Sequence, residues 1–210
     1  MILQYLKPGM TFYDVGAHFG YFTLLGSYCV GDKGQVHSFE PTPSAYSILI
    51  INAYKKKNVK LNNLALFSKK GEIFINDYGV EYSAFNSIYE ARLPKEIIKK
   101  LNTSKHKVRS MSIDEYVKAT GGKPDFVKID AESAEYEILI GMEETIKKYH
   151  PIITIEVGDF DIVGVPSSKK LIRHLVSRGY TPYEYSCDGI RVHTLRESYT
   201  YDNILFLPQK

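Results

Sequence analysis

Short apolar runs alternate with helical patterns along most of this chain, and this alternation restricts the fold more than any other feature. Helical patterns follow four of the runs and end near residues 29, 56, 141 and 178. Such alternation predicts a mostly parallel β-sheet with helices on both faces, the α/β class. The strands are predicted at residues 11–15, 35–39, 59–65, 126–130 and 151–157.

Two regions depart from this rhythm. Residues 66–107 are predicted to form an irregular insertion with an additional strand at 71–75 and a short helix at 93–101. Residues 181–186 and 203–207 have little helical sequence between them, which predicts an antiparallel hairpin at a sheet edge. We interpret residues 1–210 as one domain that contains this insertion, because 210 residues suit one domain with a substantial core.

Local signals mark where two of the helices begin. Thr42 followed by Pro43 predicts a helix start, because threonine is a favourable N-cap and proline suits the first helical position. Ser112 with Glu115 three residues later fits a capping box. We interpret the Lys55–Lys56–Lys57 run as the solvated end of the helix that Thr42 opens, where cations suit the helix dipole.

Composition excludes several classes of protein. The formal net charge of +3 is too small to argue for a nucleic-acid partner. The chain has only two cysteines, Cys29 and Cys187, which do not suggest a disulfide framework. No apolar stretch approaches the length of a membrane span. We therefore expect a cytoplasmic protein with neither a nucleic-acid nor a membrane partner.

The sequence DFVKIDAESAE, residues 125–135, is the strongest indication of a functional site. A short apolar strand ends there in a cluster of acids and then turns into a helical pattern. Buried strands rarely end in carboxylates unless those groups have partners. In open α/β sheets, ligands bind at the carboxyl ends of the strands. Asp130 and Glu132 are therefore candidate catalytic residues.

A second motif lies between the first predicted strand and its helix. Asp14, Gly16 and Gly20 occur in the sequence DVGAHFG, which lacks the Gly-X-Gly-X-X-Gly spacing of pyrophosphate-binding loops. The strand ends in an acid instead, which would repel a pyrophosphate and attract the amino group of S-adenosylmethionine. Glu40, at the end of the next strand, can accept hydrogen bonds from ribose hydroxyls.

With these motifs in place, the chain resembles the FkbM family of S-adenosylmethionine-dependent methyltransferases over nearly all of its length. Residues 8–23 resemble the family's first motif, and Phe39–Glu40–Pro41 is similar to its second. Residues 63–66 resemble the segment that leaves the third strand, and residues 125–135 resemble the family signature. The family usually has asparagine where His18 stands and glycine where Ser133 stands.

The resemblance implies a class I, Rossmann-like methyltransferase fold. Its sheet would have seven mostly parallel strands in the order 3-2-1-4-5-7-6, with the last strand antiparallel and helices on both faces. The implied reaction is O-methylation of a small hydroxyl acceptor such as a sugar. The acceptor pocket would be built from residues 78–105 and 186–202, which are rich in tyrosine; the sequence leaves the acceptor and the oligomeric state open.

Roles can be assigned to single residues on this basis. S-adenosylmethionine is the expected cofactor, with Ala65 and Leu66 as a wall near its adenine. Asp130 or Glu132 would act as the base or orient the acceptor. Glu156 is predicted to form an ion pair or hydrogen bond rather than bind a divalent cation, so no metal site is expected, although hard oxygen ligands would suit magnesium or calcium. The residues expected to bind the cofactor are Asp14, Gly16, Ala17, His18, Gly20, Glu40, Pro41, Ala65 and Leu66.

Three other functions compete with this interpretation. A nucleic-acid methyltransferase would share the sheet, but amino-directed enzymes usually have an Asn/Asp-Pro-Pro-aromatic loop where this chain has Asp130–Ala131–Glu132–Ser133. A catalytically silent binding module would keep the fold without turnover. An NAD-dependent oxidoreductase is disfavoured by the missing middle glycine.

Overall fold

The computed structural model describes residues 2–89, 91–92, 95–101, 103–186 and 189–209. Its main element is a sheet of eight strands in the order β10-β9-β11-β8-β7-β1-β2-β3. The strands β1, β2, β3, β7 and β8 are parallel to one another, and β11 is antiparallel to both β8 and β9. The strands are β1 (Thr11–Val15), β2 (Gln35–Phe39), β3 (Val59–Asn62), β7 (Phe126–Ile129), β8 (Ile152–Val157), β9 (Tyr180–Ser186), β10 (Gly189–Val192) and β11 (Asp202–Pro208).

The sheet has eight strands rather than the predicted seven, and its order differs from the predicted 3-2-1-4-5-7-6 by one added strand. The additional strand is β10, which pairs antiparallel with β9 and occupies the sheet edge that the β9–β11 pair was expected to form. Thr181–Leu207 pairing between β9 and β11 confirms the antiparallel contact itself. The β10 segment was not predicted because only four residues pair, and two of them, Arg191 and Val192, are exposed.

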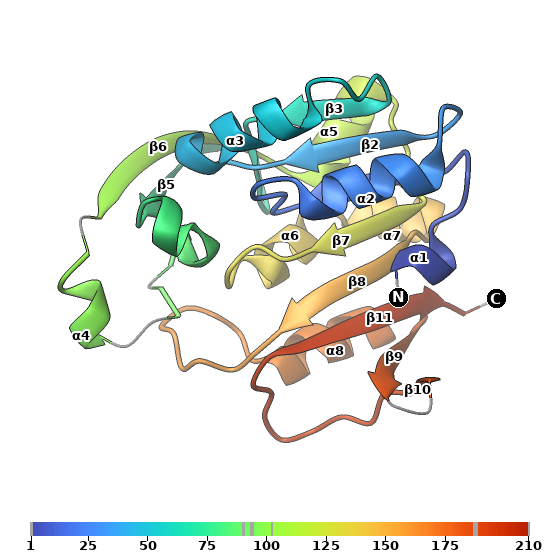
Figure 1. The fold of residues 1–210 in the computed structure, drawn as a ribbon. Coiled ribbons are helices and arrows are strands. Elements are labelled where there is room, and N and C mark those ends of the chain that lie inside the picture. The colour runs from blue at the N-terminus through green and yellow to red at the C-terminus, as the bar shows by residue number, and fades with distance from the viewer. Residues whose placement is uncertain (1, 90, 93–94, 102, 187–188, 210) are drawn as a thin grey trace.

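Helices cover both faces of the sheet (Figure 1). Side chains of α1 and α2 join Phe12, Phe126 and Leu205 in one apolar core. Side chains of α5, α6, α7 and α8 pack with Tyr13 and Val127 in a larger core on the opposite face. Neighbouring residues of a strand therefore enter different cores, as the alternation of strand side chains requires. The helices are α1 (Ile2–Tyr5), α2 (Tyr21–Val30), α3 (Pro43–Ala53), α5 (Ile113–Thr120), α6 (Glu135–Ile140), α7 (Glu143–Tyr149) and α8 (Ser168–Val176).

The predicted helix starts at Thr42 and Ser112 are confirmed. Thr42 is the N-cap of α3, although its side chain makes no capping hydrogen bond. The Ser112 hydroxyl accepts a hydrogen bond from the Glu115 N–H, and the Ser112 N–H donates one to the Glu115 carboxylate, which completes the capping box. Helix α3 ends at Ala53, three residues before the predicted end.

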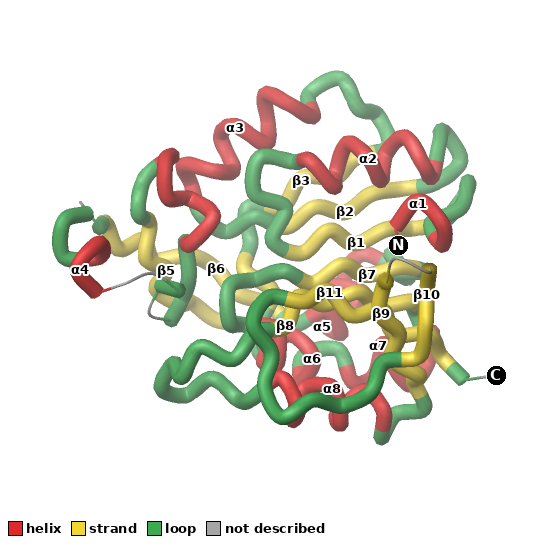
Figure 2. Tube along the Cα trace, turned by 60° about the horizontal axis from the view of Figure 1, so that its bottom comes forward, coloured by secondary structure: helices red, strands yellow, loops and turns green. Residues whose placement is uncertain are grey.

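The region predicted as an irregular insertion forms a second, three-stranded sheet in the order β4-β6-β5. Figure 2 shows it beyond one end of the main sheet, next to α4. The predicted strand at 59–65 is divided between the two sheets, so β3 belongs to the main sheet and β4 to the insertion. Its elements are β4 (Ala65–Leu66), β5 (Gly71–Asp77), a 3-10 helix at Val80–Phe85, α4 (Lys95–Ile98) and β6 (Ser104–Met111).

Two sequence-based expectations concern features outside the sheet. Within the described ranges, no helix combines the length and apolar character needed to cross a bilayer. Cys29 is a free thiol, and Cys187 lies outside the described residues.

Candidate active site

A cavity of about 420 Å³ opens at the carboxyl ends of β1, β2, β7 and β8. This volume lies within the range of small-molecule and cofactor sites. Both candidate catalytic acids and most of the candidate cofactor residues line it, whereas Asp14 and Gly20 do not. The predicted residues along its wall are Gly16, Ala17, His18, Glu40, Pro41, Ala65, Leu66, Asp130 and Glu132.

Position 16 must be a glycine because the end of the neighbouring strand β7 leaves no space for a side chain. Its φ is +73°, and a Cβ atom there would lie 1.7 Å from the carbonyl oxygen of Asp130. The backbone N–H groups of Gly16 and Ala17 both donate to the carbonyl of Phe39 at 3.0 Å. The glycine therefore brings the ends of β1, β2 and β7 together.

Gly20 has a comparable packing role. Its φ is +94°, and a side chain there would approach Leu49 Cδ1 of α3 to 2.6 Å. A glycine there allows the start of α2 to lie close to helix α3.

Asp14 is fully buried on the α2 side of the sheet. Thr23 Oγ1 donates to its Oδ2 at 2.6 Å, and Lys128 Nζ lies 3.5 Å from its Oδ1. Burial raises the pKa of this carboxyl, while Lys128 and Thr23 act in the opposite direction. Lys128 also lies 3.3 Å from Asp130 Oδ2, so one buried ammonium connects Asp14 to the cavity wall.

Glu40 is fixed at the end of β2 by two backbone donors. The N–H of His18 donates to its Oε2 at 2.9 Å, and the N–H of Thr42 donates to its Oε1 at 2.8 Å. Burial raises the pKa of this carboxyl, and the two backbone hydrogen bonds lower it. Each oxygen keeps a second lone pair that can accept a hydrogen bond from a ligand.

His18 lies in the loop between Gly16 and Gly20 with a φ of +50°. Its Nε2 is 2.8 Å from Ser83 Oγ of the insertion, and its ring stacks on Phe19 with centroids 3.7 Å apart. Burial lowers the pKa of this imidazole, which favours the neutral ring. His18 therefore connects the loop after β1 to the insertion at the cavity wall.

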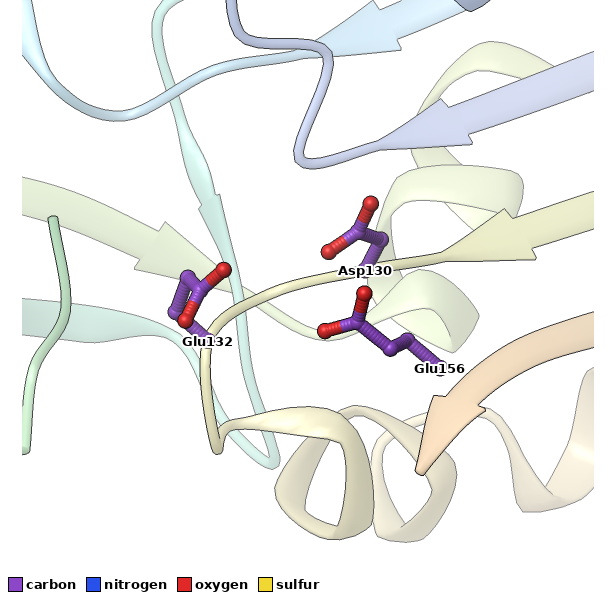
Figure 3. Close-up of side chains that lie close together, drawn as sticks. All are labelled: Asp130, Glu132 and Glu156. Carbon is purple, nitrogen blue, oxygen red and sulfur yellow. The ribbon is translucent and has the colours of Figure 1, made fainter. Parts of the chain in front are cut away.

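Asp130, Glu132 and Glu156, which all line the cavity, form an acidic cluster (Figure 3). One oxygen of each lies within 4.8 Å of the others. Arg92 of the insertion balances part of this charge. Its Nη1 lies 2.8 Å from Glu156 Oε2, and its Nε lies 3.6 Å from Glu132 Oε2. The predicted ion pair of Glu156 is confirmed, with a partner that the sequence did not indicate.

The pKa values of two of these acids are strongly raised. Burial raises the pKa of Glu132 from 4.5 to about 8, although Arg92 lowers it. Burial and the nearby Asp130 raise the pKa of Glu156 to about 7, again against Arg92. Acids with pKa values near neutrality can exchange protons at physiological pH, which suits general acid–base chemistry.

The same three carboxylates have the oxygen chemistry that a divalent cation prefers. Arg92, however, already provides a positive charge to two of them at ion-pair distance. A metal would have to compete with this guanidinium. This geometry does not test the expectation that the site holds no metal.

Glu135, the first residue of α6, organises the backbone between the two candidate catalytic acids and the helix. Its Oε1 accepts hydrogen bonds from the N–H of Ala131 at 3.0 Å and of Ser133 at 3.2 Å. It also lies 3.6 Å from Arg92 Nη2. Glu135 therefore turns toward the site and supports the loop that carries Glu132.

Comparisons with known proteins identify the family of this chain. A family model described as the methyltransferase FkbM domain matches residues 14–182. The chain belongs to the FkbM methyltransferase family. A search of curated proteins found no match.

Solved structures of methyltransferases share the fold. An FkbM methyltransferase from Methylobacillus flagellatus superimposes with a TM-score of 0.55 at 16% identity over 94% of this chain. The present chain spans only 43% of that protein's length. A fibrillarin from Aeropyrum pernix with natively bound S-adenosyl-L-methionine has a TM-score of 0.55 at 12% identity, covering 97% of this chain and 68% of the fibrillarin. A precorrin-6y C5,15-methyltransferase from Geobacter metallireducens has a TM-score of 0.51 at 14% identity, covering 99% and 85% of the two chains. The FkbM chain therefore has a class I methyltransferase-like fold.

Ser133, where FkbM proteins usually have glycine, adopts the conformation that favours glycine. Its φ is +82°, and Glu132 before it also has a positive φ of +47°. The Ser133 hydroxyl accepts a hydrogen bond from Arg92 Nε at 3.1 Å. The chain thus has a left-handed backbone turn at Ser133 together with a side-chain contact to the insertion.

Comparing Ser133→Gly with Ser133→Ala isolates the strain of this turn. Both variants lose the hydrogen bond with Arg92, but only alanine keeps a Cβ at positive φ. We expect the glycine variant to be more stable than the alanine variant by about 1–2 kcal/mol, the cost of a left-handed residue with a side chain. Urea unfolding of both variants measures the difference, and equal stabilities would contradict the strain.

Three residues near the acidic cluster, Arg92, Phe160 and Tyr201, were not predicted from the sequence. The Arg92 guanidinium lies 4.7 Å from the Phe160 ring centroid and 5.8 Å from that of Tyr201, and Tyr201 lines the cavity. All three lie in segments without strand or helix periodicity, so no spacing signal could have indicated them. Arg92 and Tyr201 do lie within residues 78–105 and 186–202, which were expected to build the acceptor pocket.

Proposed function

We propose that this chain binds S-adenosylmethionine in the cavity and methylates a hydroxyl group of a small acceptor such as a sugar. The observation that carries the proposal is that Glu40 and the acidic cluster line one and the same cavity. Membership of the FkbM family supports the choice of a methyl donor over other nucleoside cofactors.

The cofactor end is supported by the chemistry of its donors and acceptors. Glu40 has both oxygens oriented by backbone N–H groups and lone pairs left for ribose hydroxyls. Ala65 and Leu66 provide an apolar wall on the insertion side. Asp14, which does not line the cavity, would act through Lys128 and the position of the Gly16 loop rather than by contact.

The acceptor end is supported by the acids and by Tyr201. Carboxylates accept hydrogen bonds from hydroxyl groups, and an aromatic ring can lie against the apolar face of a sugar. An acidic wall disfavours phosphate-rich acceptors, since nucleic acids bind mainly through positive charge. These features favour a neutral hydroxylated acceptor over a nucleic acid.

In the proposed mechanism, the bound cofactor supplies an activated methyl group. Asp130 accepts a hydrogen bond from the acceptor hydroxyl and orients it, while Lys128 holds Asp130 in place. Glu132, with its pKa raised to about 8, removes the proton as the hydroxyl reacts. Orientation can contribute about 7–11 kcal/mol and a general base about 10²–10⁴-fold.

Cofactor binding is the first test. Isothermal titration with S-adenosylhomocysteine should show binding to the wild-type chain, and Glu40→Ala should weaken it by about tenfold or more, because hydrogen bonds to a charged group contribute about 1.5–3 kcal/mol. Glu144→Ala, an exposed acid on α7, serves as the matched control and should leave the dissociation constant unchanged.

Two results would count against the proposal. An unchanged dissociation constant in Glu40→Ala would remove the ribose role from Glu40. Binding of S-adenosylhomocysteine without methyl transfer to any of a panel of sugars and other hydroxylated compounds would favour the silent binding module.

A further inference from the structure

Helices α2 and α3, which lie side by side on one face of the sheet in Figure 1, contain no charged residue. Surface helices normally carry charged residues on the face that meets water. Here the outward positions hold large apolar and aromatic side chains. The most exposed of these are Tyr21 at 74%, Tyr28 at 82%, Ile51 at 68% and Tyr54 at 70% exposure.

Helical spacing explains why these side chains point outward. In α3, Ala45, Leu49 and Ala53 are buried at intervals of four residues, so Ile51 and the following Tyr54 lie on the opposite side. In α2, Tyr21 and Tyr28 are seven residues apart and share one side of the helix. The exposed residues therefore form outward stripes on two neighbouring helices.

A basic groove adjoins the ends of both helices. The groove has a volume of about 620 Å³, and Tyr28 lies in its wall. Four lysines and one aspartate line it, an excess of three positive charges that equals the net charge of the whole chain. Within the described residues, none of these lysines forms a salt bridge. The charged residues are Asp32, Lys55, Lys56, Lys57 and Lys60.

We propose that the α2–α3 face binds the surface of an anionic lipid bilayer. This face consists of Tyr21, Tyr28, Ile51 and Tyr54 together with Lys55, Lys56, Lys57 and Lys60. Lysines next to such a surface are attracted to its headgroups, tyrosines suit the interfacial region, and isoleucine can enter the acyl boundary. The lack of a long apolar stretch bears only on membrane-spanning segments, whereas this contact is peripheral.

Charge complementarity favours a bilayer over two other occupants. A second copy of the chain in a twofold contact would bring the same lysines toward each other, which repel. A nucleic acid would use the lysines and the tyrosine rings, but it offers no apolar partner for Ile51. A bilayer provides negative headgroups and an apolar layer in one surface.

The inference does not depend on methyl transfer. Tyr21 both belongs to the α2–α3 face and lines the cavity. The cavity mouth therefore borders the surface that would meet the bilayer, and loss of catalysis leaves the binding test unaffected.

Sedimentation with lipid vesicles tests the proposal. The full chain should pellet with vesicles that contain phosphatidylglycerol, and not with vesicles of phosphatidylcholine alone. Added salt should weaken the binding, because the attraction is screened. Lys56→Glu with Lys57→Glu should reduce the partition coefficient by about tenfold or more. Lys147→Glu with Lys148→Glu, an exposed pair on α7 across the sheet, should change it little.

A second double variant tests the apolar contribution to binding. Its melting temperature shows whether a loss of binding comes from unfolding. Ile51→Ser with Tyr54→Ser should weaken vesicle binding while the melting temperature stays near that of the wild type, because both side chains are exposed. Three binding results would overturn the proposal: no binding to anionic vesicles, binding that both double variants leave unchanged, or tighter binding to an RNA oligonucleotide than to the vesicles. A wild-type dimer that Ile51→Ser and Tyr54→Ser dissociate would also overturn it.

Discussion

Replacing Asp130 with asparagine should slow methyl transfer severely while leaving the chain folded and able to bind S-adenosylhomocysteine. Asparagine keeps the size of the side chain, and Lys128 retains Asp14 as a partner at 3.5 Å. What is lost is the carboxylate that orients the acceptor hydroxyl. We expect a decrease in kcat of about 10²–10⁴-fold, measured by transfer of a labelled methyl group at saturating acceptor.

Glu132→Gln distinguishes the two acids. If Glu132 removes the proton, kcat/KM of the wild type rises with pH through about 8, where Glu132 loses its proton, and this rise disappears in Glu132→Gln. Asp130→Asn should keep the rise at a much lower rate. Near wild-type turnover in Asp130→Asn would remove Asp130 from the mechanism.

Arg92→Met should cause a larger loss of stability than Ser133→Ala or the exposed-site substitutions. Arg92 contacts Glu132, Glu135 and Glu156, and its guanidinium is almost fully buried. Removing one partner of a buried ion pair typically costs about 3–5 kcal/mol, because the remaining charge is left uncompensated. Methionine preserves much of the apolar stem, so the loss reports mainly on charge.

The pH dependence of that loss identifies its cause. Glu132 and Glu156 have folded-state pKa values above those of the unfolded chain, so their contribution to stability is complete below about pH 4.5 and is lost as pH rises through about 7 and about 8. Without Arg92 these pKa values rise further. The stability difference between wild type and Arg92→Met should therefore widen between about pH 5.5 and about pH 8.5.

Urea unfolding at the two pH values measures this difference. Arg178→Met is the matched control, because Arg178 pairs with Glu143 at 2.7 Å in a more exposed setting. Exposed pairs contribute about 0–1 kcal/mol, so the control should lose little stability. An equal loss in Arg92→Met at both pH values would show that packing, rather than charge, explains the role of Arg92.

The sheet and one edge of the site could be predicted because their signals are local and periodic. Apolar strands that end in Glu40 and Asp130 place both acids at the same edge once the strands are parallel. Strand alternation could also have placed Asp14, since it shares a face with Phe12, which packs against α2. The reason for Gly16 could not be predicted, because the Asp130 carbonyl that excludes a side chain is more than one hundred residues away in sequence.

Of the proposed acceptor end, only the acids could be predicted from the sequence. Arg92 follows no helical or strand pattern, and its contacts with Glu132, Glu135 and Glu156 depend on how the insertion folds onto the sheet. Ser133 shows the opposite case. A departure from the usual glycine marked the position in the sequence, and the structure has a φ of +82° there.

The position of Arg92 in the insertion also affects how the sequence can change during evolution. The acids of the site belong to the sheet edge, but the cation that lowers their pKa values belongs to the insertion. Substitutions within residues 66–107 can therefore change the working pH of the site while every residue of the sheet stays the same. Proton affinity and the scaffold that holds the reactants can thus evolve separately.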